Sequence, residues 1–552
     1  MPTLPDGITL GAATPARGRS VIAARAFGPG DTVATFAGLC VTIPDSSHME
    51  RTCSYCLAVE SEDAAEDAAE DAALKMRACA GCKTSRYCDK TCQKADWQLV
   101  HSRGECKALR RAAESAARQG TPQVLPTPVR ALVQVLIRPD MAAAVAEMEG
   151  HVERTRGRDP KTWADIELQA RGALHYINRE ASPRNMAEAI ETICKLQINS
   201  FNRRDLDYGE SGIYVSPALA MLNHSCVPNA FVQFEGRNAV LHAYRPINKD
   251  DEVQISYIEP TLPLSLRQQN LKAQYQFDCG CPRCKDDLDV YQVCQNYPCL
   301  ELNLRSLTPD LDKFRNPPLE RFPHADKLLQ ENINEVYSVC AAPLTGSSQE
   351  DKVKQLRRSW KLCVPLRAAE AYAVDPLTQV IDRAGVYFSE LGNLSYGLAI
   401  ACFVALHCDP YREPMPFSTA RLKGLFMIAR LLPSTDGSTL SGGKGTLAAR
   451  LAEVLGWMDR ITVSQAVVKL IINHSTAAHL QEWQLYQQAT DLLGQLESLP
   501  HRQRENALVN AFAENPDGSE EMHFFKTAVV APVQILAGFA LEIMDAEFGT
   551  QS

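Results

Sequence analysis

Eight residues between positions 53 and 106 have the spacing of metal ligands. They form three close cysteine pairs, then a histidine and one more cysteine: Cys53, Cys56, Cys79, Cys82, Cys88, Cys92, His101 and Cys106. Thiolates and imidazole nitrogens are the usual ligands of structural zinc, and a short gap between paired cysteines points both sulfur atoms at one ion. Eight ligands are enough for two tetrahedral sites. The alternative, cysteines scattered through a core, does not explain the paired spacing.

A second concentration of chemical groups is the sequence Asn223-His224-Ser225-Cys226. Ser216-Pro217 is expected to begin a short helical piece that carries apolar residues up to Leu222, and Pro228 forces the following chain to extend. So abrupt a change from apolar to polar residues is typical of a site. The alternative is a capped helix end whose histidine is satisfied by its neighbours.

Three further cysteines follow at Cys279, Cys281 and Cys284. This triplet lacks a fourth ligand, and the thiol of Cys226 is the candidate for a third zinc site. Cys294 and Cys299 are interpreted as a structural pair.

Composition limits the class of protein. A chain of 552 residues with 45% hydrophobic and 22% charged residues is typical of a soluble globular protein with two or three domains. Met1 to Leu10 lacks signal-peptide features, and no apolar run reaches about 18 residues, so neither a signal peptide nor a membrane span is predicted. Nineteen cysteines in such a chain favour metal over disulfides. The net charge of −9 argues against a general nucleic-acid binder.

The elements that must position these groups change along the chain. Strands are expected at Ser20–Ile22 and Thr32–Phe36, on either side of a turn at Phe27–Asp31, and again within Phe231–Tyr257. The expected helical stretches are Asp89–Val100, which carries Cys92, Ala108–Gln197 with a proline break at 122–128, Leu264–Gln276, and most of the chain after Tyr291, with breaks at Pro376, Pro410 and Pro433.

An acidic low-complexity insert, residues 60–73, separates the first two cysteine pairs. It has seven acidic residues and no basic ones between Glu60 and Asp71, whereas Lys75 to Arg111 carries ten Lys or Arg against three acids. Like charges four residues apart oppose a helix, so a solvated loop is predicted. A competing hypothesis is that the insert shields the basic stretch from nucleic acid or acidic partners.

These motifs together resemble the SET and MYND domain (SMYD) family of protein lysine methyltransferases. Tyr87 to Trp97 is similar to a MYND zinc finger, Asn223 to Asn229 followed by Glu252 to Tyr257 resembles the SET catalytic motif, and Asn199-Ser200-Phe201 matches a family tripeptide. In the family, a basic-Gly-x-Gly loop, the donor loop, passes close to the methyl donor. The corresponding Arg17-Gly18-Arg19-Ser20 departs from this pattern by carrying Ser20 where the second glycine usually stands. A loose resemblance to a tetratricopeptide repeat begins at Leu391-Gly392.

The resemblance implies roles for particular residues. It assigns the first zinc to Cys53, Cys56, Cys88 and Cys92, and the second to Cys79, Cys82, His101 and Cys106. It implies three zinc ions in all. S-adenosylmethionine would be bound by Arg17, Arg19, Asn199, Ser200, Asn223, His224, Tyr257 and Phe277. Tyr257 would act at the reacting methyl group, and Tyr275 and Phe201 would line the lysine channel.

The predicted fold is α+β, a β-rich SET core followed by an all-helical TPR-like domain. The expected segments are 1–50 and 198–260 for the SET core, 51–106 for the finger, 107–197 for a helical insert, 261–290 for a post-SET zinc region and 291–552 for the C-terminal domain. The predicted function is methylation of histone or non-histone lysines. The alternative is a non-catalytic scaffold with a decayed SET domain.

Expectations about partners and location accompany this prediction. The substrate is a protein with an exposed lysine, and the finger and C-terminal helices are expected to bind peptides. We also expect the basic stretch to make weak contact with nucleic acid. The protein is expected to be a monomer without membrane association, located in the cytoplasm and the nucleus.

Overall fold

The structure is a computed structural model that divides into two compact units. The first comprises Met1–Ile258 with Gln268–Cys279, and the second Glu259–Arg267 with Gly280–Ser552. The described residues are 3–12, 18–60, 75–120, 124–207, 209–297, 306–307, 335–339, 348–435, 445–477, 480–481 and 483–549. Arg17, Cys299 and nearly all of the acidic insert therefore lie outside the described residues.

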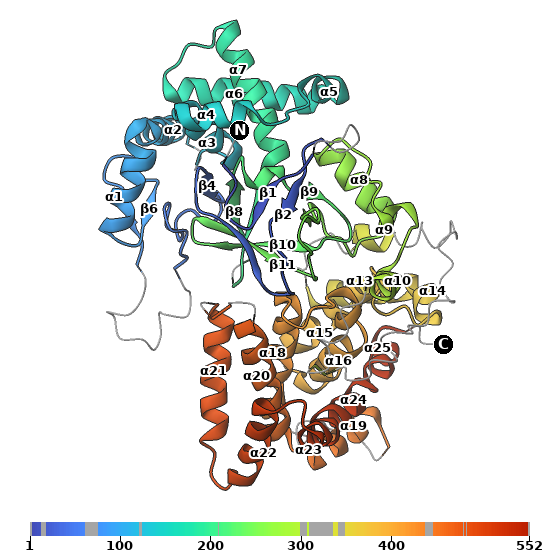
Figure 1. Cartoon of the computed structure of the whole chain (residues 1–552). Helices are drawn as coiled ribbons and strands as arrows, with labels where there is room; N and C mark the ends of the chain where they lie inside the picture. Colours follow the sequence, from blue (N-terminus) through green and yellow to red (C-terminus); the bar gives the residue numbers. More distant parts are fainter. Residues whose placement is uncertain are drawn as a thin grey trace. The chain divides into compact units, whose positions relative to one another are not determined.

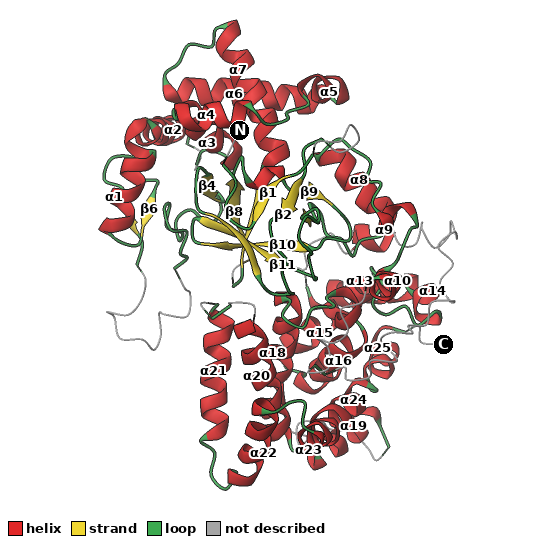
Figure 2. Ribbon diagram, viewed as in Figure 1, coloured by secondary structure: helices red, strands yellow, loops and turns green. Residues whose placement is uncertain are grey.

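Short strands build the centre of the first unit, and all strands among the described residues belong to it (Figure 2). They are β1 (Ile8–Leu10), β2 (Val21–Ala23), β3 (Thr32–Phe36), β4 (Val41–Pro44), β5 (Arg77–Ala78), β6 (Arg86–Tyr87), β7 (Phe201–Asp205), β8 (Gly209–Val215), β9 (Asn223–His224), β10 (Ala230–Glu235), β11 (Asn238–Ala243) and β12 (Gln254–Ile255). The predicted strand Thr32–Phe36 is confirmed, and β2 begins one residue after the predicted start.

The strands pair into several small sheets rather than one large one. The three-stranded sheets have the orders β10-β11-β3 and β4-β8-β7, and β1-β2, β5-β6 and β9-β12 form separate pairs. The hairpin of β10 and β11 turns at Gly236, whose φ of +52° lies in the left-handed region that glycine adopts without strain. β9 and β12 run parallel, whereas the other pairs are antiparallel.

Seven α-helices lie between β6 and β7 among the described residues (Figure 1): the first is within the predicted finger, 51–106, and the others cover the predicted insert, 107–197. They are α1 (Lys90–Leu99), α2 (Glu105–Gln119), α3 (Thr127–Leu136), α4 (Pro139–Ala146), α5 (Val152–Arg158), α6 (Pro160–Ile177) and α7 (Pro183–Asn199). Asp89, Asp159 and Ser182 begin α1, α6 and α7 by accepting hydrogen bonds from backbone N–H groups of the first turn. The break at 122–128 is confirmed, because α2 ends at Gln119 and α3 begins at Thr127.

α3 lies at the centre of this insert. Its Ala131, Leu132 and Val133 are fully buried, and the helix packs against α6, α7 and β4. The apolar face of the insert and the neighbouring strand therefore share one core.

The later part of the chain is helical wherever the structure describes regular elements. α8 (Leu264–Gln274) confirms the predicted polar helix, and the others that follow are α9 (Pro282–Lys285), α10 (Val290–Asn296), α13 (Gln349–Leu362), α14 (Val364–Ala368), α15 (Leu377–Glu390), α16 (Leu394–His407), α17 (Asp409–Arg412), α18 (Thr419–Ser434), α19 (Leu447–Trp457), α20 (Arg460–Ala477), α21 (Gln484–Glu497), α22 (Gln503–Glu514), α23 (Ser519–Phe524), α24 (Ala531–Ala537) and α25 (Ala540–Phe548). The predicted α+β class is confirmed.

Prolines mark helix boundaries in the second unit, with one exception. Pro376 precedes α15 and Pro410 is in the first turn of α17, as predicted. The predicted break at Pro433 is wrong by a residue, because α18 continues through Pro433 to Ser434. Pro433 has no N–H to donate to the Ala429 carbonyl four residues earlier, and the Ser464 hydroxyl donates to that carbonyl at 2.7 Å instead.

The repeat-like stretch after Leu391 is a helical hairpin. α15 and α16 pack against each other, Gly392 between them has a φ of +74°, and Asn393 accepts a hydrogen bond from the N–H of Tyr396 to begin α16. Glycine and asparagine thus set the turn for local reasons.

One helical stretch in the second unit is long and apolar. Ser519–Phe548 would suffice to cross a membrane by length and composition, and it contains a π-helical segment, Phe525–Val530. Because 56% of its most apolar window is buried inside the structure, it has the properties of a core helix.

Gly212 and Gly209 on β8 test how closely β4 and β8 approach. A Cβ on Gly212 would lie 2.0 Å from the Ile43 carbonyl oxygen at a φ of +146°, whereas one on Gly209 would meet open space at a φ of +79°. Gly209→Ala is expected to cost about 1–2 kcal/mol of backbone strain. Gly212→Ala is expected to lower the melting temperature at least twice as much, because the two strands must move apart. Differential scanning fluorimetry, with hydrogen exchange of β4 and β8, measures both; equal shifts would contradict the close approach.

Candidate functional site

The site is built around a parallel crossing of two chain segments in the first unit. Asn223 pairs with Gln254 and His224 with Ile255, and the N–H of Ser225 donates to the Ile255 carbonyl at 2.9 Å. Asn229 extends the crossing, since its Oδ1 accepts from the N–H of Gln254 at 2.8 Å. The asparagines of the motif therefore hold the 223–229 segment against the 252–257 segment.

Asn223 also joins the crossing to the N-terminal strands. Its Nδ2 donates to the Arg19 carbonyl at 2.8 Å and to Glu252 Oε1 at 2.9 Å. Gly18, the residue before Arg19, has a φ of +67°, and the space that a Cβ on it would take is open. A ligand can therefore approach the backbone closely at this point. Ser20, which stands where the family usually has a glycine, donates its hydroxyl to the Ala12 carbonyl at 3.3 Å.

Aromatic rings gather at the end of β12. The ring centroids of Tyr257 and Tyr275 are 4.8 Å apart, those of Tyr257 and His224 5.2 Å, and those of His224 and Phe277 5.9 Å. These four residues, the aromatic group, come from three separate parts of the sequence. Aromatic faces attract cations, so the group fits a ligand that carries positive charge.

Tyr257 is held from several directions. Its hydroxyl donates to the Leu222 carbonyl at 2.5 Å, its carbonyl accepts from the Tyr275 hydroxyl at 3.2 Å, and its N–H donates to His224 Nδ1 at 3.0 Å. Because Nδ1 accepts, the proton of a neutral His224 ring lies on Nε2, which is 3.2 Å from Cys226 Sγ. The imidazole therefore bridges the backbone of Tyr257 and a candidate metal ligand.

Burial keeps both tyrosines protonated. It raises the pKa of Tyr257 far above its usual range, and it raises the pKa of Tyr275 to about 12. Neither phenol can therefore act as a base near neutral pH.

The remaining predicted residues that the structure describes lie at the end of α7, on β7 and, for Arg19, just before β2. Asn199 Nδ2 donates to the carbonyls of Glu149 and Lys195, at 2.9 and 2.8 Å. The Ser200 hydroxyl donates to the Leu196 carbonyl, and partly buried Phe201 packs against the core cluster that Tyr257 also contacts. Arg19 donates to the Glu147 carbonyl at 3.3 Å.

The sequence analysis missed the contacts that hold the chain between Tyr275 and Phe277. Gln276 has a φ of +62°, and its Nε2 donates to Thr155 Oγ1 of α5 at 2.7 Å. Arg158 of α5 donates to the Ala273 carbonyl, and Arg154 to the Gln276 carbonyl at 3.4 Å. No sequence signal links α5 to residues more than 100 positions later, because only the tertiary fold brings them together.

The predicted zinc ligands lie in three groups. Within each group the ligand atoms are within 4.8 Å of one another: Cys53, Cys56, Cys88 and Cys92; Cys79, Cys82, His101 and Cys106; and Cys226, Cys279, Cys281 and Cys284. The grouping confirms the pairing that the family resemblance implies.

The spacing of the ligand atoms fits zinc. Zinc–sulfur bonds of about 2.3 Å in a tetrahedron place the sulfurs roughly 3.8 Å apart. Cys88 Sγ lies 3.8 Å from Cys53 Sγ, 3.6 Å from Cys56 Sγ and 3.4 Å from Cys92 Sγ. Burial, with the neighbouring thiol and thiolate groups, raises the pKa of Cys92 to about 12, so a divalent cation is needed to ionise the whole group.

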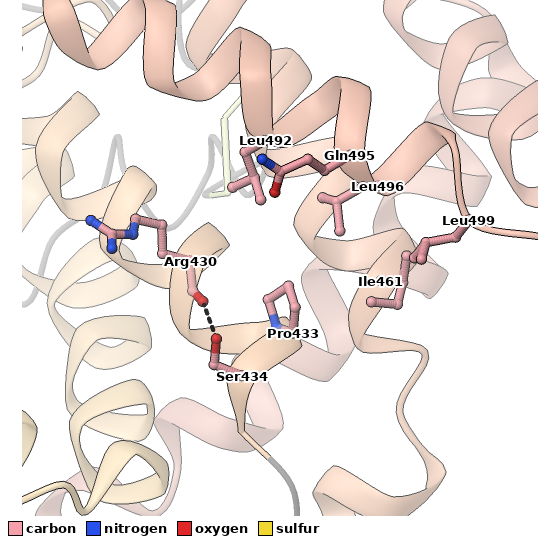
Figure 3. Close-up of a pocket in the computed structure, with 8 residues that line it drawn as sticks. All are labelled: Arg430, Pro433, Ser434, Ile461, Leu492, Gln495, Leu496 and Leu499. Carbon is pink, nitrogen blue, oxygen red and sulfur yellow. Dashed lines mark hydrogen bonds between the residues drawn. The ribbon is translucent and has the colours of Figure 1, made fainter. Parts of the chain in front are cut away.

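A cavity in the second unit has a different character. Its volume is about 410 Å³, and Figure 3 shows Leu492, Gln495 and Leu496 of α21 near Pro433 of α18. The lining is mainly apolar, with Arg430 as its ionisable side chain. It therefore offers binding surface rather than groups for proton or metal chemistry.

Known proteins resemble the part of the chain that holds the site. The family model for the SET domain matches residues 18–258. The SET domain and MYND-type zinc finger protein 6 of Schizosaccharomyces pombe is 34% identical over 245 residues, 44% of this chain and 45% of that protein. The histone-lysine N-methyltransferase ASHR1 of Arabidopsis thaliana is 27% identical over 303 residues, 52% of this chain and 58% of that protein.

A third relative extends the match. The N-lysine methyltransferase SMYD2-B of Danio rerio is 24% identical over 338 residues, 59% of this chain and 71% of that protein. The chain thus spans about half the length of the first two relatives. Residues 18–258 match the SET domain model, and the chain is similar to SET and MYND domain proteins over that part of its length.

Proposed function

We propose that this chain is an S-adenosylmethionine-dependent protein lysine N-methyltransferase that carries three zinc ions. The observation that carries the proposal is the fixed position of Tyr257 beside the parallel crossing, within an aromatic group suited to cationic reactants. The SET domain match and the names of the relatives support it.

The donor has a proposed binding surface on the first unit. Asn223 and His224 of β9, with Asn199 and Ser200 at the end of α7, offer backbone and amide groups, and Phe277 offers an aromatic face. Arg19 and the open space at Gly18 adjoin this surface. S-adenosylmethionine supplies a methyl group on a positively charged sulfonium.

The reaction needs alignment rather than a strong base. The neutral lysine nitrogen attacks the methyl carbon, the carbon–sulfur bond breaks, and its electron pair stays on sulfur, which leaves as a thioether. The methylated ammonium then loses a proton to solvent. Tyr257, Tyr275 and Phe201 are proposed to line the channel that aims the amine along this path.

Tyr257→Phe tests the assignment. It is expected to reduce kcat by about 100-fold, the scale of removing one positioned polar group from a reacting centre, and to leave donor affinity within a few-fold of wild type. Tyr244→Phe is the control, because that half-buried ring contacts Phe231 and lies outside the aromatic group. Transfer of labelled methyl to histones and to cell lysate, with calorimetry of donor binding, measures both properties.

Three outcomes of that experiment are informative. Label that depends on Tyr257 supports the enzyme and shows which substrate pool to search. A wild-type chain that neither transfers methyl nor binds donor would support the decayed scaffold, with Ser20 in the donor loop as its cause. Equal activity of Tyr257→Phe and Tyr244→Phe would remove the proposed role of Tyr257.

The rate is expected to rise with pH without a fall caused by tyrosine ionisation. Below the lysine pKa of about 10.4, each pH unit makes about ten times more neutral amine available. Because burial raises the pKa of Tyr257 and Tyr275, both phenols stay protonated up to pH 10. Initial rates from pH 7 to 9.5 with a stable substrate peptide test this. A descending limb near pH 9 that disappears in Tyr275→Phe would contradict it.

Metal analysis tests the zinc assignment independently of activity. Mass spectrometry of the dialysed wild-type chain is expected to find three zinc ions per chain, and Cys88→Ser two. Cys194→Ser is the matched control, because Cys194 is a buried cysteine of α7 outside the three groups. Three ions retained in Cys88→Ser would overturn the ligand assignment.

A further inference from the structure

Glu105 is a fully buried carboxylate beside the second zinc-ligand group, and it accepts three hydrogen bonds from side chains. Its Oε2 lies 2.9 Å from His101 Nδ1, and its Oε1 accepts from Arg130 Nε at 2.8 Å and from Gln134 Nε2 at 2.7 Å. These partners belong to the turn before α2 and to α3. One side chain therefore joins the finger to the central helix of the insert.

The contact between Glu105 and His101 Nδ1 sets the direction in which the other ring nitrogen of His101, Nε2, points. His101 Nε2 lies 3.4 Å from Cys79 Sγ and 3.7 Å from Cys82 Sγ. A carboxylate facing Nδ1 holds the imidazole proton there, so the lone pair of Nε2 points to the space between the sulfur atoms. Such outer contacts usually orient a histidine ligand and increase its basicity.

Arg130 links Glu105 to further residues of the first unit. Its guanidinium is buried and also contacts Met49 Sδ at 3.7 Å and Ser85 Oγ at 3.5 Å. Charges buried in this way are retained only when paired, because removal from water is costly. Glu105 balances the cation, and a second acid, Asp96, lies 3.9 Å from His101 Nδ1 and accepts from the Tyr87 hydroxyl at 2.7 Å.

We propose that Glu105 is a positioning residue of the second zinc site and couples zinc binding in the finger to the packing of α3. Glu105 follows His101 by four residues, and its carboxylate lies beside the imidazole. The inference rests on the proposed zinc ions but not on methyl transfer, because it concerns metal retention and folding.

Glu105→Gln keeps the shape of the side chain and removes its charge. One zinc of three is expected to pass to a colorimetric chelator about 10–100 times faster than in wild type, with the other two unchanged. Cysteine alkylation followed by mass spectrometry is expected to show exposure of Cys79, Cys82 and Cys106 first. Glu114→Gln is the control, because Glu114 is an exposed residue of the same helix that pairs with Arg110. Wild-type release from Glu105→Gln would overturn the proposal.

A double variant separates positioning from charge balance, including the case where Glu105→Gln does not fold. Glu105→Leu with Arg130→Met replaces the buried pair by apolar groups, an exchange that proteins often tolerate. The proposal expects this variant to fold, with hydrogen-exchange protection in α3, and still to release the second zinc early. Three zinc ions held as firmly as in wild type would show that Glu105 serves only to balance Arg130, and would overturn the positioning role.

Discussion

The parallel pairing of β9 with β12 is the constraint on which the candidate site depends. It is only two residues long, so side-chain amides carry much of its strength: Asn223 reaches Arg19 and Glu252, and Asn229 reaches the backbone on both sides of Val253. Without these bonds the ends of β9 and β12 would not meet, and Tyr257 would lose its contacts with Leu222 and His224.

Metal-ligand groups supply a second constraint of a different kind. Each gathers ligand atoms that repel one another when ionised, and the attraction of a divalent cation for every ligand outweighs that repulsion. Beside the second group, Arg130 and Gln134 of α3 both donate to the buried carboxylate of Glu105. These hydrogen bonds join the finger to the insert. His224 has a related position, between Cys226 and the backbone of Tyr257.

Much of the fold and of the site was predictable where the relevant forces act over short distances. Proline and capping residues mark the starts of α6 and α7, glycine marks the turn at Gly392, and paired cysteines mark the ligand groups. The spacing of His101 and Glu105 by four residues was a signal that could have identified Glu105. The end of α18 was misjudged because a distant side chain, that of Ser464, donates to the Ala429 carbonyl, which Pro433 leaves without a backbone donor.

The ligand types, the local turns and the motif around His224 can be read from the amino-acid sequence, because they follow from residue chemistry and spacing along the chain. Three contacts depend on packing between distant elements: Arg130 balances Glu105, Thr155 of α5 accepts from Gln276, and the Tyr257 hydroxyl donates to the Leu222 carbonyl. These partners are 25 to 121 positions apart. At such separations no periodicity connects two residues, and packing of the intervening elements sets which side chains meet.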